Sequence, residues 1–139
     1  MNTEIDHLGI AVRALDESLT FYRDLLGMPV SNREHVAAEN VNVAMLPCGV
    51  APGSPRIELL EGTAPESAIT RFLHKRGPGL HHLALRVDDL AAAVARLKAA
   101  GARVLNEPRT GAGGHEYVFV HPDSSGGVLL ELIQSRTEG

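Results

Sequence analysis

The chain has 139 residues, of which 44% are hydrophobic and 22% are charged, and these values predict one globular domain with an ordinary core. Its formal net charge is -4, which disfavours nucleic acid or an anionic membrane surface as a partner. Aromatic residues make up only 4% and tryptophan is absent, so no platform for stacking bases is expected. No apolar run approaches the roughly 20 residues that a membrane-spanning helix needs.

Two features predict a cytoplasmic location. The N-terminal residues 1–6 lead directly into an apolar strand, and no signal peptide is expected there. Cys48 is the only cysteine, so an internal disulfide cannot form. A chain without disulfides is typical of a reducing compartment.

The first half of the chain is predicted to form one strand, one helix and three more strands. Apolar spacing predicts a strand over Ile5–Val12 and a helix over Leu15–Leu26, which Gly27 ends. The three strands that follow are predicted at Pro29–His35, Val41–Leu46 and Arg56–Leu60. Residues 47–55 are rich in glycine and proline and are predicted to form a hairpin loop.

The second half is predicted to repeat this order after a linking helix that runs from about Ala64 to Lys75. A strand beginning at His81 and a helix over Leu90–Ala100 come next. Three further strands are predicted around Val104, at 118–120 and at 128–133, with a long loop over 107–115. The domain of residues 1–139 thus divides into module one (about 4–62), the linking segment (about 63–78) and module two (about 79–135).

The most informative feature is an internal repeat. Residues 6–12, DHLGIAV, return 75 residues later as residues 81–87, HHLALRV, and residues 57–60, IELL, resemble residues 130–133, LELI. Each half therefore supplies one histidine from its first strand and one glutamate from its last. These four residues are His7, Glu58, His82 and Glu131.

Two β-α-β-β-β modules of this kind predict an α+β fold in which the paired sheets form a cupped half-barrel. The duplication would then bring equivalent residues together on the concave side. Each glutamate lies between apolar neighbours, and a buried carboxylate needs a cation or strong hydrogen-bond donors.

Two imidazoles and two carboxylates suit a divalent transition metal. A lone strand histidine usually has a structural role, and strand alternation alone could place both glutamates toward solvent. The symmetric occurrence of both residue types in both halves favours the metal site.

Several segments resemble one known family. They are IDHLGIAV at residues 5–12, IELLE at 57–61, GLHHLA at 79–84 and GGVLLE at 126–131. By these segments the chain resembles the vicinal oxygen chelate superfamily and, within it, the methylmalonyl-CoA epimerases. The resemblance extends over about residues 5–134.

The resemblance implies a metal-dependent isomerase of propionate metabolism that interconverts (R)- and (S)-methylmalonyl-CoA. It implies one divalent ion (Co, Mn, Zn or Ni) bound by His7, Glu58, His82 and Glu131. It also implies an acyl-CoA substrate, a homodimer, and an acid/base role for Glu131. Moving the α-proton from one face of the substrate to the other calls for two acid/base groups.

The second acid/base group is a point of departure from that family. Several related epimerases carry a glutamate at the position of Val43, whose side chain cannot transfer a proton. We predict Glu39, slightly upstream, as the replacement, with Glu58 or a bound water as alternatives.

Two other functions fit the same fold. A glyoxalase I-type lactoylglutathione lyase would use the metal cup to isomerise a glutathione hemithioacetal. A non-catalytic drug-binding resistance protein can dispense with the metal, so four ligand-type residues count against that function. An extradiol dioxygenase is disfavoured because its iron site uses two histidines and one carboxylate.

Overall fold

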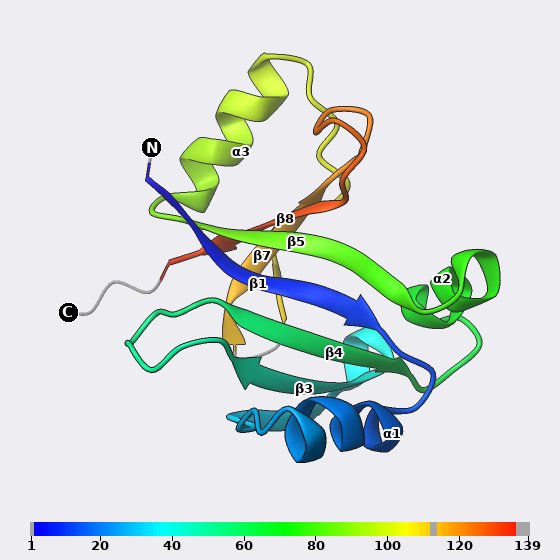
Figure 1. The fold of residues 1–139 in the computed structure, drawn as a ribbon. Helices are drawn as coiled ribbons and strands as arrows, with labels where there is room; N and C mark the ends of the chain where they lie inside the picture. Colours follow the sequence, from blue (N-terminus) through cyan, green and yellow to red (C-terminus); the bar gives the residue numbers. More distant parts are fainter. Residues whose placement is uncertain (1, 112–113, 136–139) are drawn as a thin grey trace. The chain divides into compact units, whose positions relative to one another are not determined.

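The computed structural model describes residues 2–111 and 114–135 and has a mixed α+β fold (Figure 1). Its elements in chain order are β1 (Thr3–Ala11), α1 (Leu15–Leu19), a π-helical turn (Thr20–Leu25), β2 (Asn32–Val36), a 3-10 turn (Ala37–Glu39), β3 (Val41–Pro47), β4 (Arg56–Gly62), α2 (Ala68–Arg76), β5 (Gly79–Val87), α3 (Leu90–Ala99), β6 (Arg109–Thr110), β7 (Glu116–Val120) and β8 (Leu130–Gln134). Among the described residues, no helix combines the length and apolar character needed to cross a membrane.

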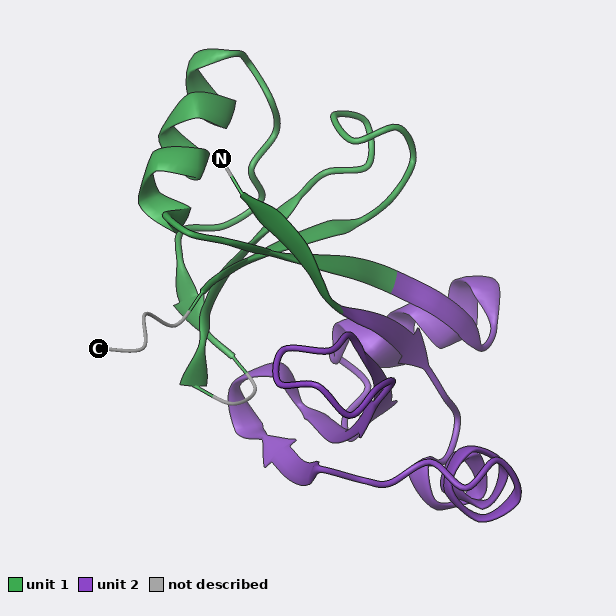
Figure 2. Cartoon of the chain, turned by 60° about the vertical axis from the view of Figure 1, so that its left-hand side comes forward, with its two compact units in different colours: residues 1–6, 82–139 green, residues 7–81 purple. Residues whose placement is uncertain are grey.

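The chain divides into two compact units (Figure 2). The N-terminal unit consists of residues 7–81, and the C-terminal unit consists of residues 82–139 together with residues 1–6. The division therefore falls inside β1 and inside β5, immediately before His7 and His82. The assignment of both units to a single domain, with modules at about 4–62 and 79–135, stays a prediction.

The N-terminal unit contains the strand order β2-β3-β4-β1, in which β1 is parallel to β4 and the other pairs are antiparallel. Successive side chains of a strand point to opposite faces, so each face has its own core. Leu15 and Leu19 of α1 pack on one face against Ala44, Leu46 and Leu59. On the other face, Ile69 of α2 packs with the cluster formed by Ala11, Val41, Val43, Met45 and Leu60.

The C-terminal unit has the corresponding order β5-β8-β7-β6, with β5 parallel to β8. The helix α3 covers one face, where Leu90, Ala93 and Val94 pack with Val87, Val118, Val120 and Leu132. The opposite face carries a small cluster of Ala84, Tyr117 and Ile133, with Phe119 against it. The order of elements in this unit therefore repeats that of the N-terminal unit.

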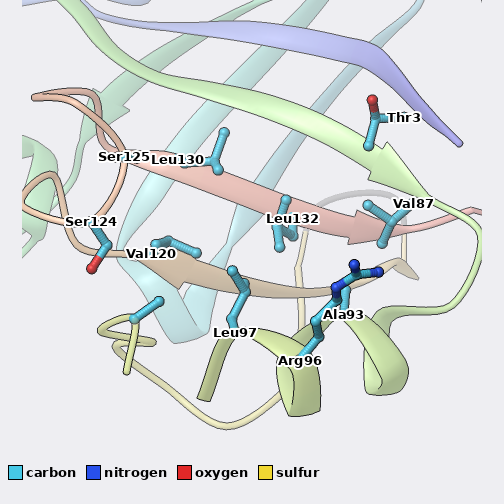
Figure 3. A pocket seen from close by; sticks show the side chains of 11 residues that line it. Thr3, Val87, Ala93, Arg96, Leu97, Val120, Ser124, Ser125, Leu130 and Leu132 are labelled. Atoms are coloured by element: carbon cyan, nitrogen blue, oxygen red, sulfur yellow. The ribbon is translucent and has the colours of Figure 1, made fainter. Parts of the chain in front are cut away.

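A cavity of about 290 Å³ lies under α3 (Figure 3). Its walls include Leu97 of α3 and, on the face of the sheet that α3 covers, Val120, Leu130 and Leu132. Because Glu131 alternates with Leu130 and Leu132 along β8, its side chain points to the opposite face. The cavity is therefore separate from the face that carries Glu131.

In both units a strand side chain caps the helix that follows the first strand. The Leu15 amide of α1 donates a hydrogen bond of 2.8 Å to Oε2 of Glu61 at the end of β4. The Leu90 amide of α3 donates one of 2.8 Å to Oε1 of Gln134 at the end of β8. Each bond satisfies an amide that lacks a partner inside its helix, so it fixes the helix start to the last strand of its unit.

The first predicted helix differs from the expectation. It is α-helical only over Leu15–Leu19 and continues as a π-helical turn in which the Leu26 amide bonds to the Phe21 carbonyl, five residues earlier. The wider turn rotates the following side chains out of the apolar stripe. Leu25 and Leu26 are consequently 74% and 58% exposed, although their spacing predicted burial.

Three other boundaries also differ. Val104 forms only an isolated bridge with Val120, and two residues further on the Phe119 amide donates to Oδ1 of Asn106 instead of to a backbone carbonyl. The predicted loop of residues 107–115 contains the short strand β6, while its residues 112–113 lie outside the described residues. The linking helix begins at Ala68 because Ser67 caps it by accepting a hydrogen bond from the Ile69 amide.

Candidate metal centre

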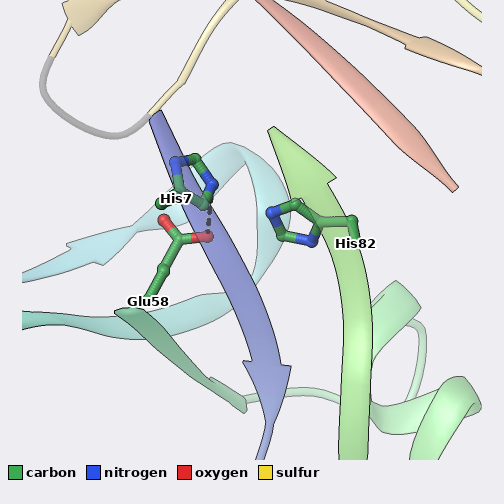
Figure 4. A group of neighbouring side chains, drawn as sticks. All are labelled: His7, Glu58 and His82. Carbon is green, nitrogen blue, oxygen red and sulfur yellow. Dashed lines mark ion pairs between the residues drawn. The ribbon is translucent and has the colours of Figure 1, made fainter. Parts of the chain in front are cut away.

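His7 and Glu58 form a buried pair in the N-terminal unit (Figure 4, which also draws His82). In the parallel ladder of β1 and β4, Gly9 is opposite Glu58 and His7 is opposite Arg56. His7 is therefore a diagonal neighbour of Glu58 on the same face of the sheet. The distance from His7 Nε2 to Glu58 Oε1 is 3.3 Å, and the two residues are 3% and 5% exposed.

His82 and Glu131 form the equivalent pair in the C-terminal unit. Ala84 of β5 is opposite Glu131 of β8, so His82 is again two residues before the residue that faces the glutamate. The distance from His82 Nε2 to Glu131 Oε1 is 3.1 Å, and both residues are buried. The Phe119 ring packs edge-on against the His82 imidazole, with 5.7 Å between ring centroids.

The donor set of each pair fits a divalent cation. Glu58 and Glu131 are themselves buried, each between two apolar neighbours in its strand, where a carboxylate needs a positive partner. Each has a histidine Nε2 atom close by, and a histidine nitrogen and a carboxylate oxygen are standard ligands of zinc and related ions. The duplication thus produces the same ligand pair twice.

Glu39 lies apart from this pair along the sheet. It ends the 3-10 turn before β3, followed by Asn40 in the left-handed conformation with φ 51°. At the start of β3, Val41 pairs with Gly62, whereas Met45 pairs with Glu58. Four residues of strand cover about 13 Å, so the register places Glu39 well away from Glu58. Its role in proton transfer stays a prediction.

Val43 lies on the face of the N-terminal sheet that carries Glu58. It is 2% exposed, and its cross-strand neighbours are Leu60 on β4 and Glu34 on β2. Sequence reasoning did not single out Glu34. The pairing of β2 with β3 that places it there requires the register of the sheet, which the sequence alone does not supply.

Comparison with known proteins identifies the class. The family model described as the Glyoxalase/Bleomycin resistance protein/Dioxygenase superfamily matches residues 6–119. The chain belongs to this superfamily.

Similar proteins within that class include epimerases. The chain is 38% identical to the ethylmalonyl-CoA/methylmalonyl-CoA epimerase of Cereibacter sphaeroides, over 94% of this chain and 96% of that protein. It is 38% identical to the mitochondrial methylmalonyl-CoA epimerase of Mus musculus, over 94% of this chain and 72% of that protein.

A solved structure of an epimerase is also similar to this chain. A variant of the Streptomyces coelicolor methylmalonyl-CoA epimerase in complex with 2-nitronate-propionyl-CoA has a TM-score of 0.92 and 38% identity. The match covers 99% of this chain and 100% of that chain. The resemblance stated from the sequence and the expected α+β class are confirmed.

Proposed function

We propose that this protein is a methylmalonyl-CoA epimerase, an isomerase that interconverts the (R) and (S) forms of its acyl-CoA substrate. The observation that carries the proposal is the pair of buried His–Glu contacts at equivalent strand positions. The proposal is supported by the 38% identity to an epimerase that acts on methylmalonyl-CoA and ethylmalonyl-CoA.

His7, Glu58, His82 and Glu131 are the proposed ligands of one divalent cation. Two nitrogen and two carboxylate ligands suit cobalt, manganese, zinc or nickel. When bound, such a cation supplies a Lewis acid that stabilises negative charge on the thioester oxygen. The remaining chemistry falls to the side chains of this chain.

Glu131 is proposed as one of the two acid/base groups. Removal of the α-proton leaves the electron pair of the C–H bond in the thioester enolate, and return of a proton to the other face completes the inversion. The face of the C-terminal sheet around Glu131 is lined by Ala84, Tyr117, Phe119 and Ile133. Their apolar surfaces exclude water, which strengthens electrostatic interactions with the substrate.

The proposal also includes a homodimer in the cytoplasm. Its support is the family to which the chain belongs and the presence of a single cysteine, Cys48. The dimer is tested by the mass measured with light scattering.

The deciding experiment measures exchange of the α-proton of methylmalonyl-CoA in heavy water by NMR, with and without added Co(II). Loss of the α-proton signal that requires both the protein and the metal is the expected result. No exchange by metal-loaded protein would contradict the proposal. Turnover of methylglyoxal with glutathione would instead favour the lactoylglutathione lyase, and tight binding of a drug without turnover would favour a resistance protein.

A further inference from the structure

The cavity under α3 lies within the C-terminal unit and is lined mainly by apolar side chains (Figure 3). One wall is α3, with Ala93 and Leu97. The other wall is the sheet, with Val120, Leu130 and Leu132. Water finds few hydrogen-bond partners between such walls, so a cavity of this kind favours an apolar molecule over water.

The internal duplication explains why this cavity exists. Gly27 follows the first helical segment and Gly101 follows α3, with φ 75° and 82°. The next residue in the N-terminal unit is Met28, whose side chain packs against the cluster that contains Leu19. The next residue in the C-terminal unit is Ala102, which lines the cavity. A methyl group thus occupies the position of a long thioether side chain, and space remains between the helix and the sheet.

Arg96 gives one end of the cavity a positive charge. It is the only charged residue among the described residues that line the cavity. In Figure 3 its side chain extends from α3 toward the sheet near Val87, and Ser124 lies at the opposite end. Within residues 2–111 and 114–135, the Arg96 guanidinium has no ion-pair partner. Its planar set of donors matches the two oxygens of a carboxylate.

The volume of the cavity indicates the size of a suitable ligand. An apolar cavity of about 150 Å³ accommodates benzene. The cavity under α3 has about 290 Å³. By this comparison it has room for an aliphatic chain of about ten carbon atoms.

We propose that this cavity binds a medium-chain aliphatic carboxylate. The chain occupies the apolar space between α3 and β8, and the carboxylate accepts hydrogen bonds from the Arg96 guanidinium. The site lies on the face of the sheet opposite to the face that carries Glu131, so it is distinct from the proposed metal centre. Binding at this cavity requires neither the metal nor an acyl-CoA, and it is independent of the proposed function.

The first experiment varies the length of the chain. Isothermal titration calorimetry of the full-length protein measures its affinity for carboxylates from butanoate to dodecanoate, at concentrations below micelle formation. Each added methylene should tighten binding by about three- to fourfold while the chain still enters the cavity. The gain should stop at about ten carbon atoms, where the cavity is full.

NMR locates the bound chain. Octanoate should shift the methyl signals of Leu97 and Val120, which line the cavity. The ring signals of Tyr117 and Phe119 should stay in place, because these residues pack on the opposite face of the sheet.

The role of the charge is tested with a neutral ligand of the same chain length. Arg96→Gln should weaken octanoate binding by about three- to tenfold and leave octanol binding unchanged, because only the carboxylate interacts with the guanidinium. Lys98→Gln is the matched control. It removes a cation of α3 that pairs with Glu107 and does not line the cavity, so both affinities should stay at the wild-type value.

The role of the space is tested by filling it. Ala102→Met introduces the side chain that the N-terminal unit has at this position, and it should weaken octanoate and octanol binding equally, by about tenfold or more. Ala95→Met adds the same side chain at an exposed position of α3 outside the cavity, and it should leave both affinities unchanged. Circular dichroism and thermal unfolding show whether each variant is folded.

Three results would overturn the proposal. Wild-type protein that binds no carboxylate of the series shows that the cavity is not a site for this class of ligand. Equal weakening of octanoate and octanol binding by Arg96→Gln shows that Arg96 does not recognise the carboxylate. A folded Ala102→Met variant with wild-type affinity for octanoate places the binding outside the cavity.

Discussion

The N-terminal and C-terminal units share the same strand arrangement around their His–Glu pairs, but the residues next to the two pairs differ. Both hold a histidine and a glutamate as diagonal neighbours across a parallel strand pair. In the C-terminal unit, Ala84 faces Glu131 across the ladder and Phe119 packs on His82. In the N-terminal unit, the corresponding positions are Gly9 and Met45.

These different neighbours suggest that the two His–Glu pairs differ in rigidity. An aromatic ring packed against an imidazole restricts its orientation, as a metal ligand requires. Gly9 has no side chain that could pack on its neighbours, and the Met45 side chain is more flexible than an aromatic ring. We therefore infer that the C-terminal pair is the more rigid of the two pairs.

The largest expected effect is loss of a histidine from either unit. His7→Ala and His82→Ala should each abolish turnover, because each removes a proposed ligand. The loss in metal affinity should exceed the roughly 10–100-fold that follows from removal of an outer partner of a ligand. Metal analysis by mass spectrometry and the inversion assay check this. A His82→Ala variant with wild-type metal content and rate would show that the proposed site is wrong.

The two glutamates should differ in what their loss does to the reaction. Glu131→Gln removes both a ligand and an acid/base group, so at saturating metal the inversion rate should fall by about 100- to 10,000-fold. Glu58→Gln keeps an oxygen ligand and removes only a charge, so its rate should remain within about tenfold of wild type at saturating metal. Rates measured over a Co(II) titration separate the two contributions. Equal defects at saturating metal would contradict the division of roles.

A smaller effect is expected at the two helix caps. Glu61→Ala and Gln134→Ala each leave a helix amide without its acceptor, which should cost about 0.5–2 kcal/mol in the free energy of unfolding. Glu61→Ala should be the more destabilising, because a carboxylate near a helix N-terminus also interacts with the helix dipole and Glu61 accepts a bond from Asn42. Urea unfolding measures the free energy of unfolding of both variants. A larger loss in Gln134→Ala would reverse this ranking.

The smallest effect is expected at the π-helical turn. Leu25→Ala should change the free energy of unfolding by no more than about 0.5 kcal/mol, because Leu25 is 74% exposed. Leu19→Ala, in the same helical segment and fully buried, should cost about 2–5 kcal/mol. Thermal unfolding of the two variants compares them directly. A large loss in Leu25→Ala would show that this side chain is covered in solution.

The sequence was sufficient to predict the features that occur in both halves of the duplication. The histidine and glutamate positions and the strand–helix–strand order recur in both halves, so each half supported the interpretation of the other. The π-helical turn has no such support. Leu25 and Leu26 have the apolar character and the spacing of core residues, and only the bond from the Leu26 amide to the Phe21 carbonyl moves them outward.

The positions of the glutamates around Val43 depend on information that the sequence lacks. Glu39 is four residues from Val43 in the chain, and the register of β3 with β4 places it away from Glu58. Glu34 is nine residues from Val43 in the sequence and directly opposite it in the sheet. Cross-strand register, which depends on turn geometry and packing, decides such contacts.

The division of the chain inside β1 has a consequence for the order in which the protein folds. Residues 1–6 belong to the unit that is otherwise formed by residues 82–139. Within that unit, Arg86 contacts Glu4 at 2.9 Å and Asp6 at 3.6 Å. Residues 1–6 therefore complete their unit only after residues 82–139 have been synthesised. Contacts between such distant residues slow folding. A gene fragment that encodes only residues 79–139 would produce a unit that lacks the segment paired with Arg86.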